Sequence, residues 1–354
     1  TALAGKWHLG STPYERGFEK FYGFLEGAGP HWHWPQVFGD FHVDADSFYS
    51  SDAYTDAGLS FIEQGLGEGK PFFLYLAFPA PHYPLHAPAE DIAKYRGRFA
   101  GGWDAIRERR VAHMKQAGFI GGEFAMKDRL LEKQPWDKRQ DGWRWESLSA
   151  EERAEQESLM ETYAAMMDKV DQNIGRLLAK LEEMGEMENT LILFAADNGA
   201  SAEWVEVGDG EIGAIDRWSS LGGDWANVSN TPFRNVKNYS HEGGICTPLI
   251  AHWPGRIPQK TISHETGHFV DIMPTLVELA GAVYPSEANG SIIPPMQGVS
   301  LVPAFEGGEL ARPDPVFFRW KNGRAIIDGD WKAVRWEPAE WELYRIRKDR
   351  TETN

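Results

Sequence analysis

The sequence PFFLYLAF at residues 71–78 is the strongest β-strand signal in the chain. It is apolar or aromatic at every position, and Pro79 closes it. A strand that is apolar on both faces is typical of the interior of a parallel sheet, where helices cover both sides. Two further runs of this kind lie at 190–196 and 248–253. The pattern therefore predicts an α/β fold.

A long amphipathic helix is predicted between the first two of these runs. Ser149 is followed by Ala-Glu-Glu, which forms a capping box. Apolar residues then recur at helical spacing as far as Leu181, and Gly185 is a typical helix stop. A helix that leads into a buried strand is half of a βαβ unit, which favours a mostly parallel central sheet between helices. Shorter helices are predicted at 52–64 and 271–280.

The end of the chain has a different pattern. Short strand-like runs are separated by polar turns, which predicts a small antiparallel sheet. These runs are 316–320, 324–327, 331–335 and 341–346. We therefore predict an α/β domain at 1–312 and a C-terminal antiparallel subdomain at 313–354.

Composition narrows the class of protein. The 354 residues include 36 Lys or Arg and 53 Asp or Glu, a net charge of −17, which argues against nucleic acid as the main partner. One cysteine excludes a disulfide framework or a multi-thiolate metal site. The longest apolar run, 72–78, is too short to span a bilayer. The chain opens at Thr1 without an initiator Met, a leader or a recognisable leading strand, so we expect it to be a truncated form.

Candidate functional residues follow the predicted strands, where ligands bind in open α/β sheets. In GKWHLG at 5–10, Lys6 and His8 would lie on one face of an extended segment and could bind an anion. The alternative is that Lys6 is a surface lysine and His8 a packed histidine. His82 lies between Pro81 and Tyr83-Pro84, in a stiff turn after the first strand. Its ring is a candidate general acid, or a histidine satisfied within the turn.

Two further clusters follow the later strands. Asp197 and Asn198 offer two oxygens to Ca²⁺ or Mg²⁺, although an ordinary turn uses the same residues and Ca²⁺ takes about six to eight oxygens. Lys237 lies in an irregular loop before a glycine pair and either contacts an anion or is a plain surface charge. His31 and His33 would lie on one face of an extended segment. They could then be metal ligands, part of an aromatic rim around the substrate, or packed side chains without a functional role.

Taken in order, these clusters resemble the formylglycine-dependent sulfatases of the alkaline-phosphatase superfamily, and the arylsulfatase-like members in particular. The resemblance runs from end to end of the chain. Its segments are GKWHLG at 5–10, PFFLYLAFPAPHYPLHAP at 71–88, ADNG at 196–199, NTPFRNVKNYSHEGGICTPLIAHWP at 230–254, DIMPTLVELAG at 271–281 and WELYRIRKDRTETN at 341–354. The resemblance implies an alkaline-phosphatase-like α/β sandwich and hydrolysis of aryl or carbohydrate sulfate esters.

The resemblance also implies roles for individual residues. Lys6 and His8 match the pair that contacts the formylglycine and the sulfate group. His82 matches the histidine that protonates or orients the leaving oxygen, and Lys237 matches a second sulfate-binding lysine. Asp197 and Asn198 match two ligands of a calcium ion. The full-length protein is then expected to be periplasmic or secreted.

The nucleophile of the family does not occur in this sequence. The family carries it in a C/S-x-P-x-R motif that is converted to formylglycine. Cys246 has Pro248 at the right offset, but Ile250 replaces the Arg, so we interpret Cys246 as a small apolar residue entering a strand. The family's pair of metal-binding aspartates is also absent. We therefore expect the nucleophile and half of the calcium site to lie in a missing N-terminal segment, and this chain alone to be inactive.

Other functions remain open on the residues alone. A phosphodiesterase or phosphonate-ester hydrolase of the same superfamily would use a similar cationic pocket for a phosphoryl group. A non-catalytic fragment that binds sulfated ligands would need no nucleophile. The expected partner is a small-molecule or carbohydrate sulfate ester rather than nucleic acid or a membrane.

Overall fold

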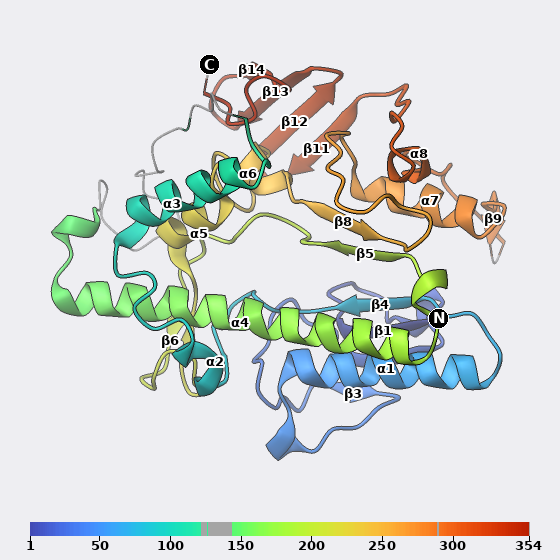
Figure 1. Cartoon of the computed structure of the whole chain (residues 1–354), viewed down its shortest axis with the longest axis horizontal. Helices are drawn as coiled ribbons and strands as arrows, with labels where there is room; N and C mark the ends of the chain where they lie inside the picture. The colour runs from blue at the N-terminus through green and yellow to red at the C-terminus, as the bar shows by residue number, and fades with distance from the viewer. Residues whose placement is uncertain (122–125, 127–143, 289, 354) are drawn as a thin grey trace. The chain divides into compact units, whose positions relative to one another are not determined.

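The chain forms two compact units in the computed structural model, which describes residues 1–121, 126, 144–288 and 290–353 (Figure 1). The first unit comprises Thr1–Ala112, Asp128–Met184 and Ala200–Thr231, and the second comprises His113–Lys127, Gly185–Gly199 and Pro232–Asn354. The units alternate along the sequence, and the boundary predicted between 312 and 313 stays a prediction.

A four-stranded sheet with the order β3-β2-β1-β4 is the centre of the first unit. Strand β1 pairs in parallel with both β2 and β4, while β3 is antiparallel to β2. The predicted α/β fold with a mostly parallel sheet is confirmed. The elements are β1 Ala2–Lys6, β2 Lys20–Phe24, β3 Phe38–Gly39, β4 Leu74–Ala77, β6 Glu206–Val207, β7 Trp218–Ser219, α1 Ser50–Gly67, α2 Ala89–Ala93, α3 Gly102–Gln116 (its first turns), α4 Ala150–Glu183 and α5 Gly222–Asn230.

The central strand of this sheet is β1, so the expectation that the chain has no leading strand is wrong. The segment is rich in Ala and Gly, which have low β-propensity, and therefore gives a weak signal. Its glycine has a tertiary role. A Cβ at Gly5 would lie 2.0 Å from the Ala77 carbonyl oxygen, and one at Gly23 would lie 1.9 Å from the Gly5 carbonyl oxygen. Only glycine lets these three backbones approach so closely.

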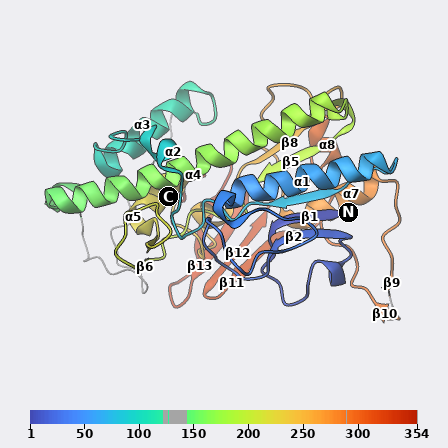
Figure 2. The ribbon, with the colours of Figure 1, turned by 90° about the horizontal axis from the view of Figure 1, so that it is seen from below.

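Helix α1 covers one face of this sheet and packs on β1, β2 and β4. Alternate strand residues, Ala2 and Ala4 of β1 and Tyr22 and Phe24 of β2, form one buried cluster with the helix residue Tyr54 and its neighbours. This period of two on the strands is what a half-buried sheet face requires. Helix α4 runs beside α1, as Figures 1 and 2 both show.

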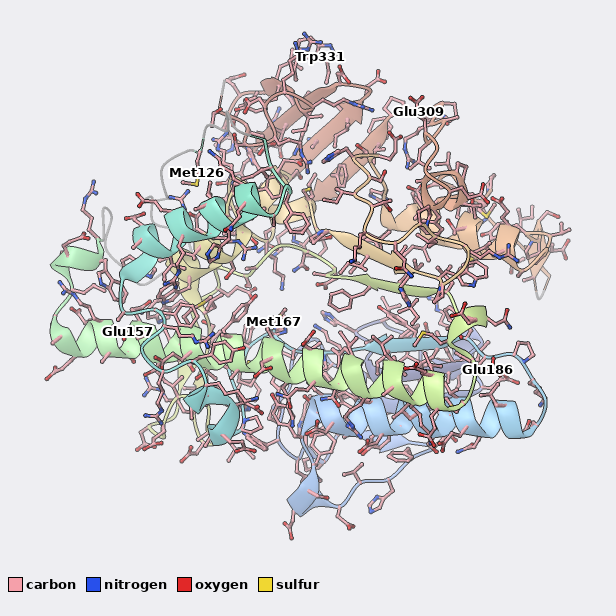
Figure 3. The ribbon with its side chains drawn as sticks, viewed as in Figure 1. Met126, Glu157, Met167, Glu186, Glu309 and Trp331 are labelled. Carbon is pink, nitrogen blue, oxygen red and sulfur yellow. The ribbon has the colours of Figure 1, made fainter. Side chains whose placement is uncertain are left out.

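The long predicted helix is confirmed as α4. The Glu152 N–H donates to Ser149 Oγ at 3.1 Å, and the Ser149 N–H donates to Glu152 Oε2 at 2.7 Å, which completes the capping box. The predicted helices at 52–64 and 271–280 correspond to α1 and to α7 (Ile272–Leu279). Within α4, Met166 is fully buried, whereas its neighbour Met167, labelled in Figure 3, is 42% exposed.

The three predicted apolar strands correspond to β4, β5 (Ile192–Ala195) and β8 (Leu249–His252). Tyr75 in β4 is 50% exposed, Phe194 in β5 is 39% exposed and Ile250 in β8 is 58% exposed. Strands β5 and β8 pair with each other in antiparallel orientation. An apolar run specifies a strand, but it specifies neither its partner nor its direction.

The second unit contains the predicted C-terminal antiparallel sheet, which is confirmed with the order β11-β12-β13-β14. Its buried face includes Ala325, Val334 and Tyr344, whereas Trp331 on the other face is 49% exposed (Figure 3). The elements are β5 Ile192–Ala195, β8 Leu249–His252, β9 Glu287–Ala288, β10 Ser291–Ile292, β11 Val316–Trp320, β12 Gly323–Asp328, β13 Trp331–Trp336, β14 Glu342–Arg345, α6 Glu242–Ile245, α7 Ile272–Leu279 and α8 Val302–Phe305. Among the described residues, no helix combines the length and apolarity needed to cross a bilayer.

The close approach at Gly5 leads to the first prediction. Gly5→Ala should lower the free energy of unfolding by about 2–4 kcal/mol, because the new Cβ meets a backbone oxygen and φ is +118°. Gly175→Ala is the matched control. It lies on the exposed side of α4 with open space around it, and it should raise stability by about 0.5–1 kcal/mol. Urea unfolding followed by circular dichroism measures both, and equal effects of the two changes would contradict this account.

Candidate functional site

Lys6 and the His82 turn leave the same edge of the parallel sheet in the first unit. Lys6 is the last residue of β1, and Gly5 pairs with Ala77, the last residue of β4. Because parallel strands end at one edge, the segment from Pro79 to His82 begins beside Lys6. This edge is where an α/β sheet binds ligands, so the structure brings these two predicted residues to one region.

His8 occupies a different conformation from the one expected. Its φ is +55°, in the left-handed region, so the alternation that would align it with Lys6 ends at that point. The expectation of one extended face is therefore wrong. The His8 N–H donates to the Leu25 carbonyl at 3.1 Å, and a Cβ at Gly27 would lie 2.5 Å from His8 Nε2. The ring is thus placed against Gly27, although the residue as a whole remains exposed.

The His82 turn is held by a buried histidine that the sequence did not single out for this role. His31 Nε2 lies 3.1 Å from the His82 carbonyl oxygen, and His31 Nδ1 lies 2.8 Å from Ser50 Oγ. A carbonyl oxygen only accepts, so Nε2 carries the proton and Nδ1 accepts from the Ser50 hydroxyl. These partners assign one neutral tautomer to His31 and fix the backbone of His82.

The neutral state of His31 has a clear physical cause. The side chain is fully buried, and burial lowers its pKa from 6.5 to about 3, with His86, His82 and Lys6 adding to the effect. His86 is also held neutral, since burial lowers its pKa to about 4, and its Nε2 donates to the Arg217 carbonyl at 3.2 Å. His33 is exposed, whereas His31 is fully buried, so the two side chains lie in different environments.

His82 itself is suited to move a proton. Its Nδ1 lies 2.9 Å from the Tyr83 carbonyl oxygen and must therefore carry a hydrogen. When the ring is charged, the second proton is on Nε2. The Nε2–H of a histidine whose other nitrogen is fixed in this way is a competent general acid.

In the second unit, Asp197 and Asn198 form the turn that follows β5. Asn198 Nδ2 donates to the Gly199 carbonyl at 2.9 Å, which leaves the amide oxygen of Asn198 as an acceptor. The Gly199 N–H donates to the Gly244 carbonyl at 3.0 Å. The turn is thus tied to the glycine pair that follows Lys237.

Lys237 lies in an irregular turn that the same glycine pair packs against. A Cβ at Gly243 would lie 2.2 Å from the Asn235 carbonyl oxygen, and one at Gly244 would lie 2.0 Å from the Tyr239 carbonyl oxygen. Glycine is therefore required at both positions. The Gly243 N–H also donates to the Arg234 carbonyl at 2.7 Å. The structure brings Lys237, Asp197 and Asn198 to one backbone junction within this unit.

The six predicted residues are divided between the units. Lys6, His8 and His82 belong to the first, and Asp197, Asn198 and Lys237 belong to the second. Among the residues that the structure describes, no group of three or more His, Cys, Asp or Glu side chains could hold a metal ion. Asp197 and Asn198 therefore provide only part of a coordination sphere.

Cys246 has the environment of a protonated thiol. Burial, with the Glu242 carboxylate beside it, raises its pKa to about 12. An Arg350 nitrogen donates to its Sγ at 2.9 Å. A nucleophilic thiolate needs the opposite shift, so this environment agrees with the interpretation of Cys246 as a structural residue.

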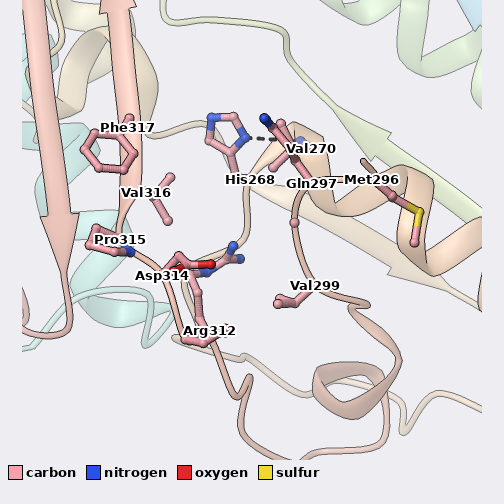
Figure 4. Close-up of a pocket in the computed structure, with 12 residues that line it drawn as sticks. His268, Val270, Met296, Gln297, Val299, Arg312, Asp314, Pro315, Val316 and Phe317 are labelled. Carbon is pink, nitrogen blue, oxygen red and sulfur yellow. Dashed lines mark hydrogen bonds between the residues drawn. The ribbon is translucent and has the colours of Figure 1, made fainter. Parts of the chain in front are cut away.

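A cleft of about 390 Å³ in the second unit is lined by none of the six residues (Figure 4). Arg312, on its wall, makes two hydrogen bonds of 3.1 and 2.5 Å to the fully buried Asp271. Asp271 also accepts the N–H groups of His268 and Val299. Arg312 and Asp271 therefore neutralise each other's charge. Their hydrogen bonds link the segment before β11 to the start of α7.

The class of protein follows from this fold, which is the alkaline-phosphatase-like α/β fold of its structural neighbours. The solved structure of Ps i-CgsB in complex with k-i-k-neocarrahexaose has this fold, with a TM-score of 0.68, 24% identity, and coverage of 100% of this chain and 66% of that one. BT4656 in complex with its substrate D-glucosamine-2-N,6-O-disulfate gives a TM-score of 0.60 at 22% identity and covers 100% of this chain and 74% of that one.

The chain belongs to the sulfatase family, whose profile matches residues 1–282. A second profile, N-sulphoglucosamine sulphohydrolase, C-terminal, matches residues 235–354. The predicted resemblance to the sulfatases of the alkaline-phosphatase superfamily, a class of sulfuric ester hydrolases, is confirmed.

Relatives are found among both microbial and animal sulfatases. An uncharacterized sulfatase of Schizosaccharomyces pombe is 31% identical over 99% of this chain and 70% of its own length. An arylsulfatase of Klebsiella aerogenes is 33% identical over 85% of this chain and 69% of its own length. An N-acetylgalactosamine-6-sulfatase of Canis lupus familiaris is 26% identical over 97% of this chain, which spans 53% of the length of that relative.

The neutral histidine behind the His82 turn leads to a second prediction. Between pH about 6.5 and 3 the unfolded chain binds a proton at position 31 that the native state does not bind, so stability should fall as the pH falls through this window. One such group contributes at most about 1.4 kcal/mol per pH unit. His31→Gln should be less stable at pH 7.5 and should decline less steeply in acid. Urea unfolding at several pH values measures the slope.

The control for this prediction is His33→Gln, which removes an exposed histidine two residues away. It should leave the slope of stability against pH unchanged. His86 remains in both variants and keeps its own share of the slope, since its lowered pKa acts in the same direction. A slope in His31→Gln equal to that of the unchanged chain would contradict the assignment of a buried neutral His31.

Proposed function

We propose that this chain forms the body of an enzyme that hydrolyses sulfate monoesters, with Lys6, His8 and His82 in the first unit and Lys237 in the second as sulfate-binding residues. The observation that carries the proposal is the placement of Lys6 and the His82 turn at one edge of the parallel sheet in a member of the sulfatase family. Cationic and proton-donating groups at that edge suit an anionic ester.

Hydrolysis of a sulfate ester needs cationic groups and a proton donor. Cleavage of a sulfate ester spreads negative charge over the sulfuryl oxygens and the departing oxygen. Lysine ammonium groups stabilise that charge more in the transition state than in the bound ester, which lowers the barrier. Nε2–H of His82 would protonate the departing alcohol or phenol oxygen, while Nδ1–H remains on the Tyr83 carbonyl. His31 would keep the turn in place for this transfer.

A calcium ion would be held in part by Asp197 and Asn198. The donor set fits a hard cation, because the amide nitrogen of Asn198 is engaged and its oxygen is left as an acceptor beside the Asp197 carboxylate. When bound, the ion would supply positive charge for the sulfate oxygens. The remaining ligands would come from elsewhere, in keeping with the two-ligand set in this turn.

The substrate class is proposed from the relatives. They include enzymes named for aryl sulfates and for 6-sulfated N-acetylgalactosamine, and one solved structure with this fold contains D-glucosamine-2-N,6-O-disulfate. We therefore propose an aryl or carbohydrate sulfate ester as substrate. Formylglycine, borne on a C/S-x-P-x-R motif, would supply the nucleophile, and no segment of these 354 residues has that motif.

Sulfate binding by the chain tests this proposal directly. Lys6→Ala and Lys237→Ala should each weaken binding of inorganic sulfate by about tenfold or more, because each removes a charge-assisted hydrogen bond worth about 1.5–3 kcal/mol. Lys70→Ala is the control, since Lys70 pairs with Glu68 on the surface and should have no effect. Isothermal titration calorimetry gives the three dissociation constants. Equal affinities across all variants would remove the support for these roles.

The missing nucleophile gives a separate expectation. The 354-residue chain should not turn over 4-nitrophenyl sulfate, because none of its residues can become formylglycine in the required motif. Release of 4-nitrophenolate measures this, with bis(4-nitrophenyl) phosphate as a parallel substrate. Turnover of the sulfate ester that depends on Lys6 would show that the chain holds its own nucleophile. Faster turnover of the phosphodiester would favour the phosphodiesterase alternative.

A further inference from the structure

Three charged side chains are buried together in the second unit. Lys332 Nζ lies 2.7 Å from Glu242 Oε1 and 2.8 Å from Glu352 Oε1. The side chains of Lys332 and Glu352 are 0% exposed, and that of Glu242 is 5% exposed. Burial lowers the pKa of Lys332, but the two carboxylates outweigh it and raise the pKa above its usual value. Buried charges of this kind are costly to form and costly to break singly.

The three residues come from segments far apart in the sequence. Lys332 points to the buried face of β13, next to the exposed Trp331, as strand alternation requires. Glu352 follows β14 and has a φ of +56°, a conformation that a non-glycine residue adopts only when its surroundings impose it. Glu242 is the first residue of α6. The cluster therefore fastens α6 to the C-terminal sheet and to the segment that follows it.

Glu242 is connected to the Lys237 turn through the backbone of the two residues that follow it. Its N–H donates to Glu352 Oε2 at 2.9 Å, so both its main chain and its side chain are held. The next two residues are Gly243 and Gly244, whose backbones contact both ends of the turn from Arg234 to Tyr239. No side chain can intervene there, so a shift of Glu242 becomes a shift of the turn.

The flanks of Lys237 are held by the same sheet. Arg234 pairs with Glu342 of β14, and its guanidinium also donates to the Tyr344 hydroxyl. Trp320 Nε1 of β11 donates to Asn238 Oδ1 at 2.8 Å. The ring of Tyr239 stacks on Trp336 of β13, with centroids 4.3 Å apart. Three strands thus contact the residues on either side of Lys237.

We propose that Lys332 and Glu352 are positioning residues. The ion pairs of Lys332 with Glu242 and Glu352, and the hydrogen bond from the Glu242 N–H to Glu352, hold the Lys237 turn in its sulfate-binding conformation. This inference rests on the proposed function for the role of Lys237. It gives the C-terminal sheet a part in anion binding without a side chain that touches the anion. The same junction holds the Asp197–Asn198 turn, through the Gly199 N–H and the Gly244 carbonyl.

A double-mutant cycle on sulfate affinity tests the proposal. Glu352→Gln keeps the shape of the side chain and removes its charge, and it should weaken binding of inorganic sulfate by about tenfold. In the Lys237→Ala background the same change should have no further effect, because Glu352 acts through Lys237. An equal loss with and without Lys237 would overturn the proposal. Arg347→Gln is the matched control, since it removes an exposed ion pair with Asp330 and should leave affinity unchanged.

Amide hydrogen exchange gives a second readout that does not depend on sulfate. In Glu352→Gln the amides of Gly199 and Gly243 should exchange at least about tenfold faster, while those of Ala325 and Val334 in the centre of the sheet stay protected. Unchanged exchange at Gly199 and Gly243 would also overturn the proposal. If Glu352→Gln does not fold, Arg350→Gln replaces it, because the partly exposed Arg350 contacts Glu242, Cys246 and Phe233 of the same junction.

The two readouts separate this inference from the proposed function. If the unchanged chain binds no inorganic sulfate, the function proposed for Lys237 fails, and the exchange of the Gly199 and Gly243 amides still decides whether the cluster holds the junction. If sulfate binds and Lys237→Ala weakens it, but Glu352→Gln changes neither affinity nor exchange, the function stands and the positioning role is wrong.

Discussion

Close approach of backbones is the constraint on which both candidate regions depend. In the first unit, Gly5 and Gly23 let β1 lie against β2 and β4, and Lys6 follows directly at the end of that strand. In the second unit, Gly243 and Gly244 let α6 lie against the turn that carries Lys237. A side chain at any of these positions would meet a backbone oxygen at 2.2 Å or less. The positions of Lys6 and Lys237 thus depend on glycines that pack backbone against backbone.

The two units manage buried titratable groups in opposite ways. Around the His82 turn, His31 and His86 are neutral, because burial lowers their pKa values and each has partners that suit one tautomer. Behind the Lys237 turn, burial is instead offset by opposite charge, with Lys332 between Glu242 and Glu352. A neutral histidine costs little to desolvate but loses its advantage in acid. An ion cluster costs more to bury and is harder to open.

Local signals carried much of the fold. The capping box at Ser149 and the apolar period up to Leu181 predicted α4, because a helix is determined by residues within a few turns of one another. The turns at 322–323 and 328–329 likewise predicted the C-terminal sheet. Strand β1 was not predicted. Its Gly5 is needed because the backbone packs closely against Ala77, which lies 72 residues away in the sequence. The antiparallel pairing of β5 with β8 was missed for the same kind of reason, because apolar strands do not encode their partners. His8 does not continue the extended conformation of Lys6, because its φ angle lies in the left-handed region.

The sequence by itself determined the family and the α/β class, because these depend on motifs of a few neighbouring residues. It singled out Lys6, His82 and Lys237 but could not say what holds them. Tertiary structure alone decided that His31 supports the His82 turn and that Lys332 and Glu352 meet at Glu242. Those contacts join residues 51, 90 and 110 positions apart. Burial and hydrogen-bond geometry at such separations exist only once the chain has folded.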